Sequence, residues 1–371
     1  MKISIDRNSL LNTLSHVQNV VERRNTVPIL SNILIDAKSN NIVLSATDMD
    51  LSITETIVCS VIEEGSITTA ALTLFEIVRK TPEGSEIELI SNDGSKLSVR
   101  SGKSKFSLSC LPKDDFPKID NLSLESEFSI QSEILKKMID KTKFAISNEE
   151  TRYYLNGIYF HIIKTEDRSI LRSVATDGHR LAKFEHEFTG GDLNLPGIII
   201  PKKTINEVRK LLEENSEEIK ISVNESKIIF FIDNIVLTSK LIDGSFPDYE
   251  KVIPKNNDKE MFAKTSLIYE AIDRVSTVSS EKSKSVKLSL SENIASLSSN
   301  SAETGSGAED LEVKYPGEKI EIGYNAKYLL EIINQIDGEE VNFKLFDSSS
   351  PSIIQDLKDH STLYILMPMR V

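Results

Sequence analysis

The fold is decided by three similar stretches of the chain, TLFEIVRK at 73–80, TINEVRKLL at 204–212 and AKYLLEII at 326–333. In each stretch the apolar residues recur at the spacing of a helix that buries one face. A polar turn and a short strand pattern follow every time, with EIEL at 86–89, EIKI at 218–221 and EVNF at 340–343. Because order, spacing and turn chemistry all recur, the sequence predicts three copies of one folding unit.

A second set of matching segments precedes these helices. KISID at 2–6, FSIQS at 128–132 and MFAKT at 261–265 each alternate like a strand and lead into a helical pattern. The first of these helices could be capped by Asn8 or Ser9, and the apolar stripe of the second extends to Phe144. The copies lie about 125 to 130 residues apart, which is near the commonest size of a domain.

Strand patterns fill the space between the two helices of each copy, for example at 33–37, 42–46, 53–58 and 157–162. Two short helices against many strands predict an α+β architecture, with helices packed on antiparallel sheets and a two-fold similarity inside each copy. Polar joints near 120–126 and 254–260 predict domains at 1–123, 124–256 and 257–371. The serine-rich region 276–310 is expected to form strands with a mobile loop at 301–308.

The bulk composition limits the possible functions. The chain has 371 residues, 39% hydrophobic and 27% charged, with a formal net charge of −13. Such a charge argues against a protein that coats itself with nucleic acid, although a local basic strip remains possible. Cys59 and Cys110 cannot form a disulfide framework. No signal peptide or membrane-spanning stretch is visible, so we expect a cytoplasmic protein that does not contact membranes.

Motifs for catalysis, phosphate binding or metal binding do not stand out, and no catalytic residue, metal or cofactor is predicted. One segment could pass for an active site, ATDGHRL at 175–181, because Asp177 and His179 lie close together. No nucleophile or second carboxylate accompanies them. A tight Asp-Gly turn that presents His179 and Arg180 at a binding groove is the alternative.

Several segments in order now identify a family resemblance. They are VPILSN at 27–32, RSGKSKFSLS at 100–109, DFP at 115–117, RYYLNG at 152–157, ATDGHRL at 175–181, SKLIDGSFPDY at 239–249 and MPMRV at 367–371. The chain resembles the bacterial DNA polymerase III beta subunit, the sliding clamp family, over its whole length. The resemblance implies three clamp domains and a head-to-tail homodimeric ring around DNA, with helices lining the hole. It implies a non-catalytic processivity factor.

The partners implied by the resemblance are a second copy of the chain and double-stranded DNA, which is bound independently of sequence. Others are the replicative polymerase alpha subunit, the clamp loader, and other polymerases and repair proteins that bind through short linear motifs. Weak phosphate contacts would permit sliding. The residues expected to contact DNA are Arg24, Arg79, Lys141, Arg152, Tyr153, Tyr154, Lys202 and Lys203. Glu149 departs from the family, which usually has an uncharged polar residue there.

The resemblance also places a peptide groove between the second and third domains. Its expected residues are Leu155, Thr176, Gly178, His179, Arg180, Leu181, Pro247, Lys251, Val252, Ile365, Met367, Pro368, Met369 and Arg370. Two methionines beside leucine, valine and proline form an adaptable apolar pocket. The segment at 367–370 could equally be a strand that closes the core of the third domain. Lys251 replaces an arginine that is common in the family, which would weaken planar contacts.

Ring closure is expected where an edge strand of the first domain meets the third domain of another copy. The expected interface residues are Lys103, Lys105, Phe106, Leu108, Thr277, Val278 and Glu303. The family often has more acids and larger apolar groups here, so we expect a dimer that dissociates more readily than its relatives. Two rival functions stay open from the residues alone: a nucleic-acid-processing enzyme that uses Asp177 and His179, and a protein-only scaffold that never encircles DNA.

Overall fold

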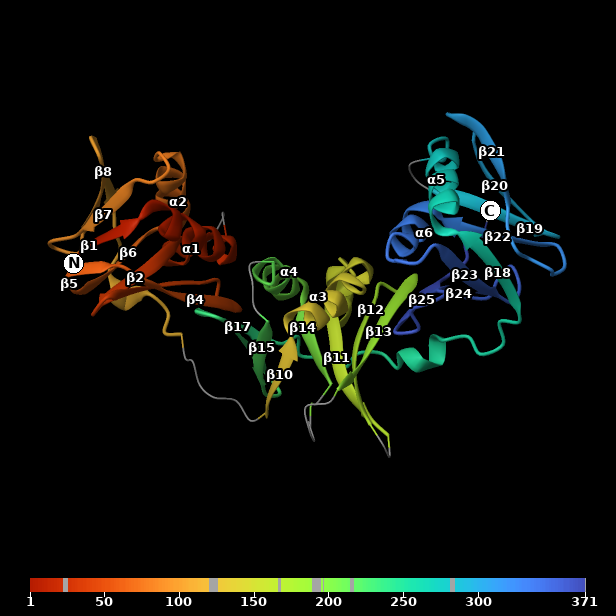
Figure 1. Ribbon diagram of the computed structural model, residues 1–371, viewed down its shortest axis with the longest axis horizontal. Coiled ribbons are helices and arrows are strands. Elements are labelled where there is room, and N and C mark those ends of the chain that lie inside the picture. Colours follow the sequence, from red (N-terminus) through yellow and green to blue (C-terminus); the bar gives the residue numbers. More distant parts are fainter. Residues whose placement is uncertain are drawn as a thin grey trace. The chain divides into compact units, whose positions relative to one another are not determined.

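The structure is a computed structural model that describes residues 1–22, 26–119, 126–165, 168–188, 195, 197–213, 217–280 and 284–370 (Figure 1). The chain divides into two compact units. The first consists of Met1–Lys136, Leu193–Pro196 and Lys203–Leu241, and the second of Lys137–Asp192, Gly197–Lys202 and Ile242–Val371. Each unit contains two antiparallel sheets, as the alternating strand patterns predict.

The first unit has a five-stranded sheet in the order β5-β1-β7-β8-β9 and an eight-stranded sheet in the order β10-β15-β16-β17-β4-β3-β2-β6. The strands are β1 (Lys2–Asp6), β2 (Asn32–Lys38), β3 (Asn41–Thr47), β4 (Leu51–Val58), β5 (Ser60–Glu63), β6 (Gly65–Ala70), β7 (Glu86–Ile90), β8 (Lys96–Ser101), β9 (Ser104–Ser109), β10 (Ser126–Gln131), β15 (Glu218–Val223), β16 (Lys227–Ile232) and β17 (Ile235–Lys240). β17 pairs with β4, so strands of the first and central repeats form one continuous sheet (Figure 1).

Helix α1 (Arg7–Val20) packs on α2 (Ala71–Lys80) and against β3 and β4. The expected stripe is confirmed, because Leu10, Leu14 and Val17 are fully buried. Truncating such a side chain to alanine typically costs about 2–5 kcal/mol. The expected cap is wrong: Asp6 accepts the bond from Ser9 N at 2.9 Å, and the helix begins at Arg7. A carboxylate there suits both the free N–H groups and the helix dipole.

The second unit has an eight-stranded sheet in the order β14-β11-β12-β13-β25-β24-β23-β18 and a four-stranded sheet in the order β21-β20-β19-β22. The strands are β11 (Gly157–Lys164), β12 (Ser169–Thr176), β13 (Arg180–Phe188), β14 (Ile198–Pro201), β18 (Lys259–Lys264), β19 (Ser285–Ser291), β20 (Ile294–Ser301), β21 (Gly305–Glu312), β22 (Ile320–Asn325), β23 (Glu340–Leu345), β24 (Ser352–Asp356) and β25 (Thr362–Leu366). β13 pairs with β25, so this sheet joins strands of the central and third repeats.

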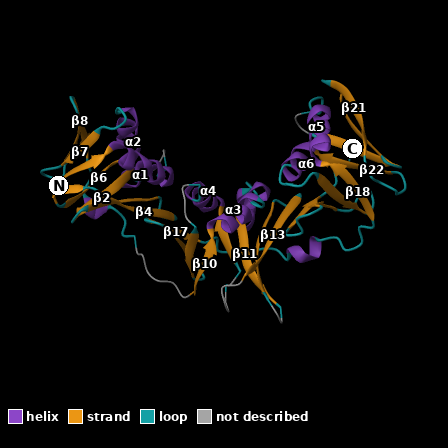
Figure 2. Ribbon diagram, viewed as in Figure 1, coloured by secondary structure: helices purple, strands orange, loops and turns teal. Residues whose placement is uncertain are grey.

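Helices α5 (Thr265–Ser276) and α6 (Ala326–Ile333) pack together on the strands of the third repeat (Figure 2). The central repeat contributes α3 (Ser132–Asp140) and α4 (Lys202–Leu211). Five short 3-10 helices complete the described elements. They are η1 (Pro28–Ser31), η2 (Lys113–Asp115), η3 (Lys143–Ala145), η4 (Glu150–Leu155) and η5 (Tyr249–Val252).

The element order confirms the predicted repeat and sharpens it. A strand, a helix and three strands recur six times along the described chain, with β5 as an insertion. Two expectations are corrected. Phe144 lies in η3, because α3 ends at Asp140. The segment 301–308 is not a loop, since Ser301 pairs with Gly305 across a tight turn and β21 continues the pairing. Gly305 has a φ of +102°, which suits glycine in such a turn.

Candidate functional site

A cavity of about 350 Å³ opens on the second unit, where the ends of several elements converge. Its walls come from η4, from the turn between β12 and β13, from η5 and from the end of β25. The lining residues are Arg152, Tyr154, Leu155, Thr176, Gly178, Arg180, Leu181, Pro247, Asp248, Tyr249, Val252, Ile365 and Met367. We call this cavity the groove. Apolar atoms make up most of its exposed surface, which is typical of a site for an apolar ligand.

The turn between β12 and β13 is built by one carboxylate. Asp177 Oδ1 accepts hydrogen bonds from the backbone N–H groups of His179 at 2.9 Å and Arg180 at 3.0 Å. Gly178 has a φ of +87°, a conformation that side chains with a Cβ rarely adopt. A Cβ on Gly178 would also lie 2.6 Å from Arg152 Nη1. The Asp-Gly sequence therefore shapes one wall of the groove.

The floor of the groove is an aromatic and aliphatic cluster. Val174, Leu181, Tyr249 and Ile365 are buried together, and Tyr159 and Phe246 pack against them. The rings of Tyr159 and Phe246 stack with centroids 4.8 Å apart. Flat rings and β-strand side chains give this floor a fixed shape, because few of their torsions can change.

Polar side chains hold Tyr249 from behind the floor. Its hydroxyl contacts His161 Nε2 at 2.9 Å and accepts a hydrogen bond from Arg172 Nη1 at 3.0 Å. Burial raises the pKa of Tyr249 to about 12. Burial lowers the pKa of His161 to about 4, and the neighbouring Arg172 charge acts in the same direction. Both groups are therefore neutral near pH 7 and can act only as hydrogen-bonding supports.

The basic side chains of the groove are paired with acids. Arg180 is buried and binds Asp177, Glu331 and the carbonyl of Phe144, with its guanidinium over the Tyr328 ring. Arg152 binds Glu149 through two contacts of 2.7 and 2.8 Å. This pairing lowers the pKa of Glu149 and raises that of Arg152.

The structure brings together most of the predicted groove residues. His179 and Lys251 flank the groove and do not line it: His179 stacks on Tyr328, and Lys251 pairs with Asp248 at 2.9 Å. A separate cavity of about 710 Å³ is lined by Lys287, Glu321, Gly323, Ser348, Ser349, Pro368, Met369 and Arg370. The alternative prediction, a strand at 367–370 that closes the core of the third domain, agrees in part with the structure. Met369 N donates to Gly323 O at 2.8 Å, which joins this segment to β22.

Four lining residues were missed or assigned elsewhere. Arg152 and Tyr154 were predicted to contact DNA, and the structure places both in the groove wall. Asp248 and Tyr249 were not predicted at all. Their position between Pro247 and Lys251 could have identified them, because a 3-10 turn brings neighbouring residues to the same site.

The residues predicted to contact DNA have different environments. Arg24 lies outside the described residues. Arg79 and Tyr153 are exposed, and Lys202 Nζ donates to Asn148 Oδ1 at 2.6 Å. Lys203 is paired with Asp48 and also donates to Val20 O. Lys141 requires a correction: its side chain is buried and donates to Asp337 at 2.8 Å and to Gln335 O, so it is not a solvated phosphate contact.

The predicted interface residues lie on an edge strand, in turns and at the end of α5. β9 is the edge of the five-stranded sheet and carries Lys105, Phe106 and Leu108, while Lys103 lies in the turn before it. Phe106 lines a cavity of about 510 Å³ with Leu72 and Ile77 of α2. In the second unit, Thr304 of the turn before edge strand β21 donates to the carbonyl of Val278 at 2.6 Å. Thr277 and Glu303 are exposed close to these two residues in the sequence.

Family models for the DNA polymerase III beta subunit match this chain almost end to end. The N-terminal domain model matches residues 1–120, the central domain model 129–248 and the C-terminal domain model 250–370. The chain belongs to the beta sliding clamp family. The beta sliding clamp of Caulobacter vibrioides is 45% identical and that of Escherichia coli K12 is 37% identical, each over 100% of both chains.

Solved structures of beta sliding clamps agree with this assignment. The clamp of Bartonella birtlesii, solved bound to griselimycin, is 46% identical over 100% of both chains with a TM-score of 0.97. A clamp of Caulobacter crescentus with bound polyethylene glycol is 45% identical with a TM-score of 0.97, and the match covers 100% of this chain and 99% of that one. The three clamp domains predicted from the sequence are confirmed, although their exact boundaries stay a prediction.

The function predicted from the resemblance, that of a DNA sliding clamp, is confirmed by these relatives. The rival function as an enzyme is wrong, since sliding clamps are non-catalytic processivity factors. The geometry agrees: both oxygens of Asp177 are occupied by Arg180 and the turn. Among the described residues no acid, histidine and cysteine cluster could hold a metal ion. No helix in the described part of this clamp is long and apolar enough to cross a membrane.

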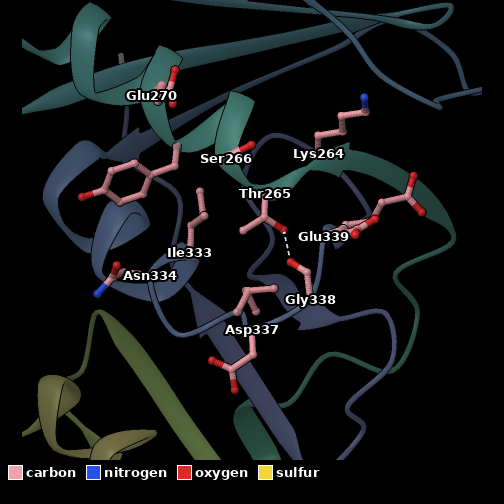
Figure 3. Close-up of a pocket in the computed structure, with 12 residues that line it drawn as sticks. Lys264, Thr265, Ser266, Glu270, Ile333, Asn334, Asp337, Gly338 and Glu339 are labelled. Carbon is pink, nitrogen blue, oxygen red and sulfur yellow. Dashed lines mark hydrogen bonds between the residues drawn. The ribbon is translucent and has the colours of Figure 1, made fainter.

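A larger cavity of about 680 Å³ lies between the start of α5 and the turn after α6 (Figure 3). Thr265 Oγ1 donates to Gly338 O at 2.8 Å across its base. Glu270, Asp337 and Glu339 lie around it without converging on one point (Figure 3), and Asp337 is paired with Lys141. Volume alone therefore does not identify the site in this clamp. The smaller groove has the apolar floor that an anchored ligand needs.

Proposed function

We propose that the groove binds short linear segments of the replicative polymerase alpha subunit, the clamp loader, and other polymerases and repair proteins. One observation carries this proposal: an apolar cavity with a fixed aromatic floor opens beside the flexible side chain of Met367. Such a cavity suits one or two large apolar anchors on an otherwise extended peptide. Unstructured tails lose conformational entropy on binding, so modest affinity and ready exchange are expected.

The predicted groove residues differ in their role within this proposal. Leu155, Leu181, Val252 and Ile365 would contact the anchors, because they line the cavity with apolar atoms. Met367 can change its rotamers to fit anchors of different shape. Pro368, Met369 and Arg370 line the neighbouring cavity, so they would contact residues upstream or downstream of the anchors.

A second part of the proposal is the head-to-tail ring. Two edge strands support it, since among the described strands β9 and β21 each have one side with no paired neighbour, which a second copy can extend into a continuous sheet. Lys103 and Lys105 would face acids of the other copy. Glu309 contributes little to this charge pairing, because both of its oxygens are bound by Arg274. Glu303 and Asp310 remain as exposed acids near that edge.

Duplex DNA would pass through the ring and touch it weakly. Arg79, Lys202, Lys203 and Tyr153 are the described residues that we propose for these contacts, together with Arg24. A ring retains DNA by topology, so phosphate contacts can stay few and independent of sequence. We further propose domains at 1–123, 124–256 and 257–371 and a cytoplasmic location, in keeping with a role beside DNA polymerase III.

Loading onto a nicked circular DNA by a clamp loader, followed by linearisation, tests the ring directly. A ring slides off the cut ends, so bound protein should disappear after cutting and persist on the intact circle. Protein that stays on linear DNA would identify a surface binder, and protein that never loads would favour a protein-only scaffold. Blocking both ends of the linear DNA with bulky proteins is the control, because it should restore retention.

A further inference from the structure

The cations beside the groove are each neutralised by an acid of the same unit. Arg152 at the rim is bound by Glu149 through two contacts, Nη2–Oε1 at 2.7 Å and Nε–Oε2 at 2.8 Å. Lys251 is bound by Asp248, with Nζ–Oδ2 at 2.9 Å. Arg180 in the wall is bound by both Asp177 and Glu331.

The local charges therefore cancel. Four basic side chains pair with four acidic ones; the bases are Arg152, Arg180, Lys251 and Lys327, and the acids are Glu149, Asp177, Asp248 and Glu331. One of these acids, Asp248, lines the groove itself. An acidic side chain on a bound peptide would meet cations that are already paired, and it would lie near carboxylates that repel it.

The pairs differ in how easily a ligand could exchange them. Arg180 has only 6% of its side chain exposed, and its partners hold the shape of the groove wall. Glu149 is 54% exposed and Arg152 33% exposed, so their pair can open without unfolding the wall. The Arg152 guanidinium also lies against Gly178, where a Cβ would be 2.6 Å from Nη1. Glu149 therefore determines whether the Arg152 guanidinium is available to a ligand at this rim.

We propose that Glu149 is a specificity-determining residue that makes the groove select uncharged, apolar-anchored peptide segments and discriminate against acidic ones. The inference rests on the proposed peptide-binding function of the groove and names the class of segment that it takes. Glu149 acts by occupying Arg152, which would otherwise pair with an aspartate or glutamate of the ligand. The effect is local, so it does not follow from the net charge of the chain.

Fluorescence anisotropy with labelled synthetic peptides tests this inference. One peptide carries leucine and phenylalanine anchors with no charged residue, and its derivatives carry aspartate or asparagine at each position flanking the anchors in turn. The full-length wild-type dimer should bind the asparagine peptides about two- to fivefold more tightly than their aspartate partners, as expected for partly exposed charges. In Glu149→Gln the ratio of the affinity for the asparagine peptide to that for the aspartate peptide should fall to one or below at the position that reaches Arg152. The uncharged peptide should keep its affinity.

Glu150→Gln is the matched control, because it removes an equal charge from the exposed neighbouring residue. It should leave the ratio unchanged, and 0.5 M salt should shrink the ratio in the wild type. Equal binding of aspartate and asparagine peptides by the wild type, or an equal effect of the two variants, would overturn the inference alone. Failure of the uncharged peptide to bind the wild type would overturn the proposed groove function and the inference with it.

Discussion

Gly178 lies directly against Arg152 at the mouth of the groove: a Cβ built on Gly178 would be 2.6 Å from Nη1 of that arginine. We expect Gly178→Ala to weaken peptide binding about tenfold, because the Arg152 guanidinium, which lines the groove, must move away from the new methyl group. The backbone φ of +87° adds a strain of about 1–2 kcal/mol for any residue with a Cβ. Thermal unfolding and peptide titration measure the two effects separately.

Gly94→Ala is a matched control for this variant. Gly94 has a similar φ of +76°, but a Cβ there would meet nothing within 4 Å. It should lower the unfolding temperature comparably and leave peptide affinity unchanged. An equal loss of affinity in both variants would show that strain, and not the contact with Arg152, controls the groove.

Met367 is the flexible apolar side chain at the groove, and 40% of it is exposed. Met367→Lys should lower peptide affinity about tenfold or more, since a charge would replace the surface that an anchor buries. Stability should change little because the ammonium can reach solvent. Leu357→Lys, at a residue 38% exposed and away from the groove, is the control. Wild-type affinity in Met367→Lys would remove this residue from the binding site.

The repeat could be predicted from the sequence because its signals are local. The apolar spacing at 73–80 and the strand pattern at 86–89 depend only on neighbouring residues, and the structure contains α2 and β7 there. The pairing of β17 with β4 could not be predicted in this way. It joins Leu237 to Ile53 across more than a hundred residues, and alternation within a strand does not specify its neighbour.

In the candidate site, too, features set by neighbouring residues could be predicted, and contacts between distant segments could not. The turn at Asp177 and Gly178 could be predicted from the sequence, because an Asp-Gly pair favours a tight turn in many proteins. The burial of Lys141 was not, since its partners Asp337 and Gln335 come from a distant segment. A lysine on an amphipathic helix gives no local sign that its ammonium will be bound by another segment. Glu331, which pairs with Arg180 from a distant segment, could not be predicted for the same reason, whereas Glu149 and Asp177 lie only three residues from the arginines that they pair with.

Phe106 on edge strand β9 is 41% exposed and lines the cavity beside α2. Phe106→Asp should raise the dissociation constant of the dimer about tenfold or more. In the proposed dimer the partner would cover the ring, so the variant would bury an aspartate without solvent. Sedimentation velocity from nanomolar to micromolar concentrations measures the dissociation constant. Ile62→Asp places the same change on β5, the opposite edge of that sheet, where the residue is 56% exposed. An equal shift in both variants would mean that β9 is not the closing edge.

The wild-type dimer is itself expected to dissociate more readily than its relatives. Thr277 and Val278 offer small apolar surfaces to the partner, and Glu309 is already occupied by Arg274. Sedimentation of this clamp beside that of Escherichia coli, at equal salt, provides the comparison. A dimer that persists at the lowest nanomolar concentrations in moderate salt would contradict this expectation.

Substitutions of Lys202 and Lys141 should have different effects on the affinity for DNA. Lys202→Ala should weaken binding to duplex DNA and reduce the slope of log affinity against log salt by about one, as for a lost phosphate contact. Lys141→Ala should leave the slope unchanged and lower stability, because the buried ammonium links two segments of the second unit. Lys220→Ala, on β15, removes an equal charge from an exposed strand position and is the control. A reduced slope for Lys141→Ala would contradict its structural role.

His161 makes stability depend on pH in a defined window. Its pKa in the folded chain is about 4, against an ordinary value of 6.5, because burial disfavours the charged ring beside Arg172 and Tyr249. Between pH 4 and 6.5 the unfolded chain therefore binds a proton at His161 that the folded chain does not, so stability rises with pH across this window. The total should be at most about 2 kcal/mol, since the ring is only partly buried and solvent screens part of the effect.

His161→Gln should remove this component while keeping a hydrogen-bonding group near Tyr249. Urea unfolding at pH 7.5, 6 and 5 should show a smaller loss of stability toward low pH in the variant than in the wild type. Buried carboxylates also titrate in acid, so the informative quantity is the difference between the two proteins at each pH. The exposed His360→Gln is the control and should track the wild type. Parallel pH profiles for wild type and His161→Gln would show that this ring is protonated as easily in the folded clamp as in the unfolded chain.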